Sequence, residues 1–134
     1  MNTFLSKLLS VIFFTLASAC PVFSWTLIDE SATGNKIYID WRDVRKLNSL
    51  VYFWQLTSLQ SPSSTTLNWL SKISYQRVNC ANMESQALFD YFYDGKMGDG
   101  KFLLEIISPE ENWYKLEKNS IGSYVASTIC SNSS

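Results

Sequence analysis

The sequence predicts an α+β domain: an antiparallel β-sheet of about six strands, with one C-terminal helix tied to it by a disulfide. Three observations predict this fold. Apolar and aromatic residues recur with the short period of strands through most of the chain. After Ser120 the apolar residues change to helical spacing. Cys80 ends a strand-like segment, and Cys130 lies in the helical one.

Composition narrows the classes of function. The chain has 134 residues, of which 46% are hydrophobic and 15% aromatic, enough for one packed domain. Its formal net charge is -1, without a long run of either sign, which argues against a nucleic-acid partner. It has no histidine, and this excludes Ser-His-Asp and Cys-His triads and histidine-ligated zinc. We expect no cofactor, no metal and no enzymatic activity.

Residues 1–24 have the pattern of a signal peptide. One lysine precedes an apolar core, 8–17, which is too short to span a bilayer. Small residues then allow cleavage after Ala19 or after Ser24. We favour Ser24, because a proline follows the first position closely and Trp25 begins the periodic part of the chain.

A third possibility involves Cys20. The segment 17–20 resembles a bacterial lipobox, in which the cysteine is lipidated and becomes the new N-terminus, although alanine stands where leucine is usual. The remaining domain, 25–134, is therefore expected to be exported, and to be attached to a membrane only if Cys20 is lipidated.

Six segments have strand character. The segment 50–56 is the strongest, because both of its faces are apolar or aromatic; we expect it to be buried on both sides or to face a partner, such as a second copy. The stretch 41–48 is charged and turn-like, and 57–68 is the one long loop. The predicted strands are 25–28, 36–40, 50–56, 71–80, 86–93 and 101–107.

The later strands carry more specific expectations. In 71–80, Ile73, Tyr75 and Arg77 share one face of the strand. The segments 86–93 and 101–107 should pair as an antiparallel hairpin, since only a tight turn joins them.

The last element is a helix with Ser120 as its N-cap. With the signal peptide cut after Ser24, or with Cys20 lipidated, two cysteines remain free to pair. An even number in an exported chain favours a Cys80–Cys130 disulfide, which would close a loop of about 50 residues. The alternative is two buried free thiols. The residues whose helical spacing predicts this last element are Ile121, Tyr124, Val125 and Ile129.

The glycine-rich turn 95–101 nearly has the spacing of a phosphate-binding loop. It lacks the Ser or Thr that would bind Mg²⁺, because Phe102 stands there, and a strand follows it rather than a helix. Asp94 and Asp99 lack the ligand alternation of a calcium loop. The turn is therefore interpreted as a hairpin tip.

The aromatic residues of the predicted strands have two interpretations. Core packing is the default for such side chains. A sheet face rich in Tyr and Trp is also typical of a protein-binding surface. The candidate partner contacts are Tyr52, Trp54, Tyr91 and Tyr93.

A set of landmarks occurs in order along the chain: Trp25, Tyr38, Ile39, Asp40, Val51, Trp54, Ser71, Lys72, Cys80, the turn 95–100, Trp113, Ser120 and Cys130. Together they resemble the surface-adhesin protein E-like domain of Gram-negative bacteria. The resemblance implies an antiparallel sheet with a C-terminal helix tied to it by a disulfide, an exported protein, and an adhesin that meets host matrix proteins. The basic residues frequent in the family after the first cysteine are absent from 82–86, so the resemblance does not extend to a cationic surface there.

We therefore expect a small, exported, non-catalytic binding module that contacts proteins through its sheet surface, in the periplasm or on the outer membrane and cell surface of a Gram-negative bacterium. Its partner would be a host matrix protein. The alternative is a periplasmic accessory protein that binds a bacterial envelope protein.

Overall fold

The computed structural model describes residues 22–133. Most of the predicted signal peptide, and Cys20 with it, lies outside the described residues. The elements in chain order are β1 (Trp25–Glu30), β2 (Lys36–Asp40), the 3-10 turn η1 (Trp41–Asp43), β3 (Arg45–Leu47), β4 (Leu50–Ser58), β5 (Ser71–Asn79), β6 (Glu84–Tyr93), the 3-10 turn η2 (Lys96–Gly98), β7 (Phe102–Ile107), β8 (Tyr114–Lys115) and α1 (Ile121–Asn132).

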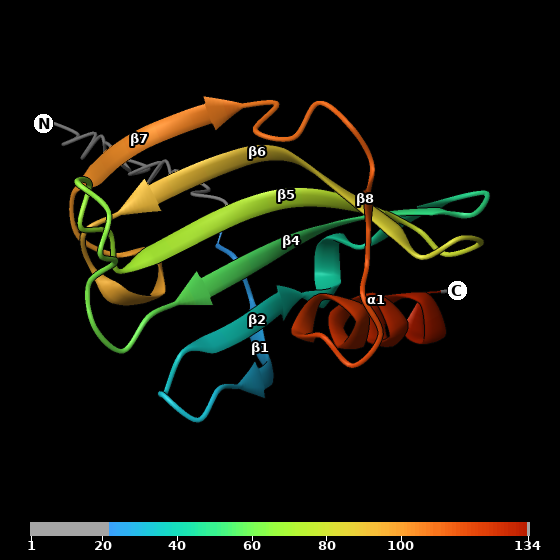
Figure 1. The fold of residues 1–134 in the computed structure, drawn as a ribbon, viewed down its shortest axis with the longest axis horizontal. Coiled ribbons are helices and arrows are strands. Elements are labelled where there is room, and N and C mark those ends of the chain that lie inside the picture. The colour runs from blue at the N-terminus through green and yellow to red at the C-terminus, as the bar shows by residue number, and fades with distance from the viewer. Residues whose placement is uncertain (1–21, 134) are drawn as a thin grey trace, which may run out of the picture.

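The strands within residues 22–133 form one antiparallel sheet. Its spatial order is β1-β2-β4-β5-β6-β7, while β3 pairs with β4 and β8 pairs with β6 (Figure 1). The expected hairpin is confirmed, because β6 pairs antiparallel with β7. The fold prediction is confirmed, with eight strands in place of six.

The two additional strands are short. All three residues of β3 are exposed, and they pair with the beginning of β4; β8 has two residues, which pair with the beginning of β6. These residues are strands because they pair with β4 and β6. Their sequences do not alternate between apolar and polar residues, so the sequence analysis did not predict them. The predicted loop 57–68 runs instead from 59 to 70, because β4 continues to Ser58.

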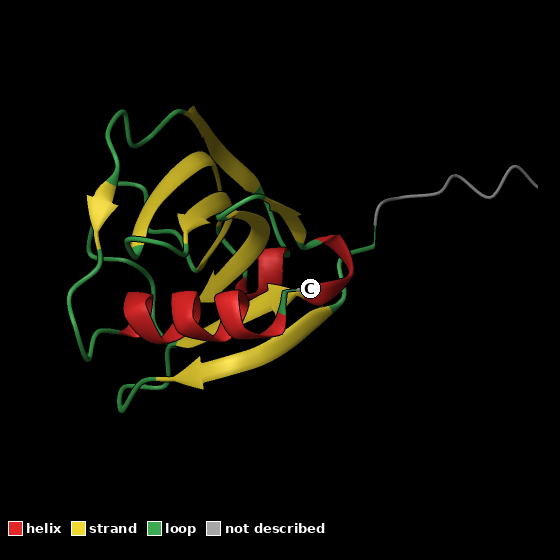
Figure 2. Cartoon of the chain, turned by 90° about the vertical axis from the view of Figure 1, so that its right-hand side faces the viewer, coloured by secondary structure: helices red, strands yellow, loops and turns green. Residues whose placement is uncertain are grey.

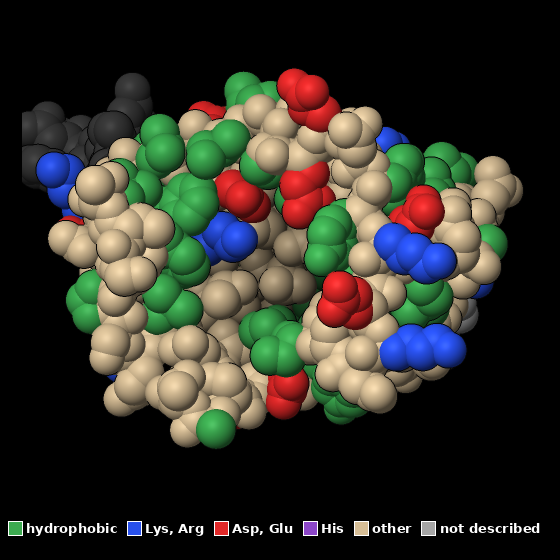
Figure 3. All heavy atoms as spheres, in the orientation of Figure 1, with side chains coloured by type: hydrophobic (Ala, Val, Ile, Leu, Met, Phe, Trp, Pro, Cys, Tyr) green, Lys and Arg blue, Asp and Glu red, His purple; other side chains and the backbone are tan. Residues whose placement is uncertain are grey.

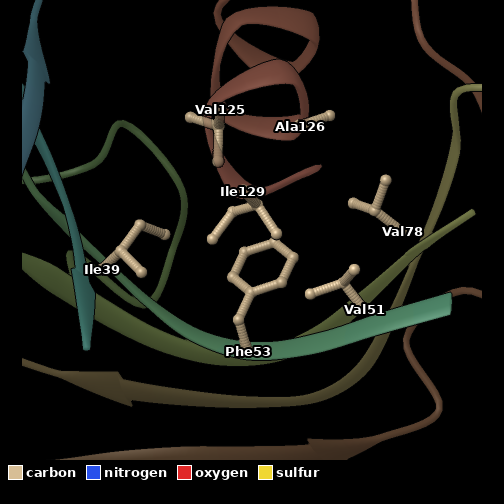
Figure 4. Close-up of a cluster of buried hydrophobic side chains, with 7 residues drawn as sticks. All are labelled: Ile39, Val51, Phe53, Val78, Val125, Ala126 and Ile129. Carbon is tan, nitrogen blue, oxygen red and sulfur yellow. The ribbon is translucent and has the colours of Figure 1, made fainter. Parts of the chain in front are cut away.

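The helix lies against one side of the curved sheet (Figure 2). Ser120 caps it as predicted, since its Oγ accepts a hydrogen bond from the Ser123 backbone N–H at 3.1 Å. Of the residues at predicted helical spacing, Ile121 and Tyr124 are exposed, and Ala126 takes an inward position. The core seen in Figure 4 consists of Ile39, Val51, Phe53, Val78, Val125, Ala126 and Ile129.

A disulfide joins Cys80 to Cys130, with their Cα atoms 5.8 Å apart. Cys80 directly follows β5, and Cys130 lies in the last turns of α1. The predicted pairing is confirmed, and the alternative of two free thiols is excluded. The bond therefore holds the last turns of α1 at the end of β5.

The sheet has two unlike faces. On β4, Val51 and Phe53 point to the core beneath α1, whereas Tyr52 and Trp54 alternate with them and point to the opposite face. We call this second side the open face, because α1 does not cover it. No helix within residues 22–133 is long and apolar enough to cross a membrane.

Candidate functional site

An aromatic row crosses the open face at right angles to the strands. Trp54 of β4, Tyr75 of β5 and Phe89 of β6 are direct cross-strand neighbours. The ring centroids of Trp54 and Tyr75 are 4.7 Å apart, and those of Tyr75 and Phe89 6.4 Å. Tyr52 and Tyr91 flank these three, each 6.2 Å from a ring of the row. We define the aromatic row as these five side chains, all of which are half-buried.

The row exists because the strand register matches the side-chain alternation. Residues that share a face recur every second position, so a ring on each of three adjacent strands becomes one line only if the strands pair in step. Aromatic side chains at such cross-strand distances attract one another by about 0.2–1 kcal/mol per pair. The contacts within the row therefore stabilise the sheet, and the exposed parts of the same rings form part of its surface.

Two aromatic residues extend the row: Phe23, which precedes β1, and Trp25, the first residue of β1. Phe23 stacks on Trp25 with ring centroids 4.8 Å apart, and its ring lies 5.5 Å from that of Trp54 in an edge-on arrangement. The Ser24 backbone N–H donates to Asp40 Oδ2 at 3.2 Å. Residues 23 and 24 thus pack on the folded domain.

Trp54 is held in place by η1. Its indole Nε1–H donates to Asp43 Oδ2 at 3.1 Å, while Asp43 Oδ1 accepts from Arg45 Nε at 3.0 Å. Satisfying the indole N–H fixes the orientation of a large ring whose face is still partly exposed.

Two tyrosines of the row, Tyr75 and Tyr91, have raised pKa values and stay neutral at physiological pH. Burial, followed by the negative charge of Asp43, raises the pKa of Tyr75 above its usual value of 10.0. Burial, followed by the charge of Glu105, raises the pKa of Tyr91. Tyr75 and Tyr91 therefore present uncharged rings with hydroxyl groups.

The row has a boundary on each side, in the direction of the strands. On one side the turn around η2 folds over the sheet, where Ser71 Oγ accepts from the Gly98 N–H at 2.8 Å and Ser58 Oγ accepts from the Met97 N–H at 3.2 Å. This turn is a hairpin tip closed by its own residues, since Asp94 Oδ1 accepts from the Lys101 N–H. On the other side, the Arg77 guanidinium lies under the ring of Trp113, with 4.6 Å from Cζ to the ring centroid.

Three of the four aromatic residues predicted to contact a partner lie together in the row: Tyr52, Trp54 and Tyr91. Tyr93 is apart from it, at the end of β6, where its ring packs against Phe102 of the edge strand β7 at 5.8 Å. Sequence reasoning did not single out Phe89, although it stands on a predicted strand. Its place in the row depends on a register that the sequence does not reveal.

The rest of the described chain offers little for bond-making chemistry. Residues 22–133 contain no group of three His, Cys, Asp or Glu side chains placed to hold a metal ion. On the side drawn in Figure 3, acidic and basic side chains are scattered without a large patch of one sign. The open face presents the half-buried side chains of the aromatic row.

Comparisons with known proteins agree with this fold. The family model described as surface-adhesin protein E matches residues 25–131. Crystal form II of Haemophilus influenzae protein E is 22% identical, with a TM-score of 0.59, and the match covers 84% of this chain and 94% of that one. Protein E from non-typeable Haemophilus influenzae is 20% identical, with a TM-score of 0.53 and coverage of 85% and 80%. No curated protein matches the chain in sequence.

Proposed function

The chain belongs to the surface-adhesin protein E family, and from this premise we propose that it is an exported, adhesin-like binding module without catalytic activity. It contacts a partner protein through the open face of its sheet. Family membership supports an adhesin at the cell surface. The contact mode is argued from the geometry of the open face.

The observation that carries the proposal is the aromatic row. Trp and Tyr are the residues most enriched where proteins bind one another, because they bury a large area with few rotatable bonds. Here five rings lie side by side, half-buried, on the face opposite the helix. A partner's surface would complete their burial, with Tyr52, Trp54 and Tyr91 among the contacts.

Two features support a role without catalysis. The sequence lacks histidine, the most common general base. Burial raises the pKa values of Tyr75 and Tyr91, so these two phenols stay protonated at neutral pH and cannot accept a proton as bases.

A host matrix protein is the partner that the adhesin family favours. A bacterial envelope protein is the alternative, and it would make the chain a periplasmic accessory protein. A second copy of the chain could also cover the row. Because β4 lies inside the sheet between β2 and β5, a dimer formed through β4 would have to use its aromatic side chains rather than its backbone.

The test replaces two rings of the row. The double variant Tyr75→Ser and Tyr91→Ser removes aromatic area but leaves Tyr52 in place. The matched control is Tyr114→Ser and Tyr124→Ser, which changes two tyrosines that are 57% and 53% exposed on β8 and α1. Binding to an immobilised panel of extracellular-matrix proteins should fall at least about tenfold in the row variant and little in the control.

Equal loss in both variants, with both folded by circular dichroism, would contradict binding through the row. The protein could instead bind no matrix protein but cross-link to a protein in envelope extracts, with less cross-linking in the row variant. This result would favour the periplasmic alternative. Light scattering at high concentration tests the second-copy alternative, since a monomer leaves the row free for a different protein.

A further inference from the structure

Within residues 22–133, one arginine beside the aromatic row is held only by neutral groups. Arg77 Nε and Nη2 both donate to Gln86 Oε1, at 2.9 and 2.6 Å, and Nη1 donates to the Tyr52 hydroxyl at 3.4 Å. The Trp113 ring covers the guanidinium at 4.6 Å. These contacts attract the cation and fix its plane.

The group that holds the arginine is itself fixed. Gln86 is only 8% exposed, and its Nε2 donates to the backbone oxygens of Glu110 and Glu111 at 3.0 and 3.1 Å. The same chain segment continues to Trp113. Arg77 is therefore ordered before any partner arrives, which lowers the entropy lost when it binds one.

The positive charge of Arg77 has no carboxylate partner among residues 22–133. The ion pairs of this region join Arg42 to Asp40, Arg45 to Asp43 and Lys72 to Asp90. A guanidinium has five N–H donors, and the contacts above use three of them. One donor on each Nη atom is left, which is the pair that a planar oxyanion accepts from in a two-pronged contact.

Arg77 and Trp113 line a pocket of about 610 Å³ next to the row. The other walls come from the β3–β4 turn, from Asn79 and from the start of β6. Glu84 is also in the wall, and its Oε2 accepts from Asn82 Nδ2 at 3.2 Å. The pocket thus combines one unpaired cation with an aromatic wall and one carboxylate.

We propose that this pocket receives the carboxylate of an Asp or Glu side chain from the protein bound by the aromatic row. This step rests on the proposed function and adds the chemistry of its partner: an apolar or aromatic patch with an acidic residue beside it. A carboxylate fits better than a phosphate, because it is planar and carries one charge, and Glu84 repels a doubly charged group more strongly.

The test uses two short probes. Acetyl-Tyr-Glu-Tyr-amide and acetyl-Tyr-Gln-Tyr-amide differ only in the acidic group. Each is titrated into the ¹⁵N-labelled protein, and the Arg77 Nε–H and Trp113 indole N–H resonances are followed. The Glu peptide should shift both resonances and bind about fivefold more tightly than the Gln peptide at low ionic strength, and salt should narrow that difference.

Variants identify the residue responsible. Arg77→Gln should remove the preference for the Glu peptide, and Arg77→Lys should recover only part of it, since lysine keeps the charge without the planar fork. The matched control Arg42→Gln removes an equal charge from an exposed arginine outside the pocket and should leave the preference unchanged. Glu84→Gln should strengthen the Glu peptide about two- to threefold by removing a like charge.

Equal affinity of the two peptides for the unaltered protein would overturn the proposal, and this comparison requires no variant to fold. A preference abolished equally by Arg42→Gln would also overturn it. If the preference is absent while Tyr75→Ser and Tyr91→Ser still weaken partner binding, the proposed function stands and this inference fails. If the preference is present while those two changes do not weaken partner binding, the pocket binds a carboxylate and the proposed function fails.

Discussion

Trp54 connects the aromatic row to η1 and to the residues before β1. Its ring contacts Tyr75, Tyr91 and Phe23, while its indole N–H is bound by Asp43. A tryptophan fixed by a hydrogen bond and by neighbouring rings has little rotamer freedom left to lose on binding. This is the property expected of an interface anchor.

Another single residue, Tyr75, should make the free energy of unfolding depend on pH. Burial and the charge of Asp43 raise the pKa of Tyr75 in the folded protein above 10.0. The folded protein then keeps a proton that the unfolded chain releases. The resulting stabilisation is fully present below about pH 10 and is lost as the pH rises through the raised pKa.

The measurement is urea unfolding between pH 8 and 11. Tyr75→Phe removes the titrating hydroxyl, so its free energy of unfolding should fall less steeply above pH 10 than that of the unaltered protein. Adding Tyr91→Phe should flatten the curve further, because burial and Glu105 also raise the pKa of Tyr91. Parallel curves for all three proteins would contradict the prediction.

At the scale of elements, α1 is joined to the sheet in two ways. Val125, Ala126 and Ile129 bury its inner side, and the Cys80–Cys130 disulfide fixes its last turns. The bond closes a loop with a sequence separation of 50. By the chain-entropy relation, such a loop corresponds to about 4 kcal/mol of stability.

Replacing both cysteines by serine should therefore lower the free energy of unfolding by about 4 kcal/mol, measured by urea denaturation. Reductant added to the unaltered protein should cause a similar loss, and reductant added to the double variant should cause none. A loss below about 1 kcal/mol would mean that apolar packing alone holds α1 in place.

At the scale of the whole molecule, the residues before β1 contact the open face. Phe23 stacks on Trp25 and contacts Trp54. A mature chain that begins at Trp25, as the predicted cleavage after Ser24 would leave it, lacks this ring. We expect it to be less stable than a chain beginning at Val22 by about 1 kcal/mol, and to expose more of Trp54.

Thermal unfolding of the two purified chains measures the difference, and Phe23→Ala in the longer chain is the matched control, which should reproduce most of it. The intact mass of the protein exported by a Gram-negative host, with and without reductant, then identifies the natural start and whether Cys20 carries a lipid. Equal stability of the two chains would show that Phe23 does not support the row.

Features that depend on residues close together in the chain could be predicted from the sequence. The two-residue period predicted six of the strands, Ser120 marked the start of the helix, and two cysteines in an exported chain predicted the disulfide. The strands β3 and β8 could not be predicted, because their exposed residues become strands only by pairing with β4 and β6.

Which side chains lie together on the open face depends instead on how the strands pair in the folded sheet. Between β5 and β6 the register shifts at Tyr75 and Gln76, so that Gln86 faces Arg77 while Phe89 faces Tyr75. Strict alternation would place positions 86 and 89 on opposite faces of β6. The shift brings both to the open face, and it therefore places the arginine pocket beside the aromatic row. No local pattern predicts such a shift, because it arises from contacts between strands.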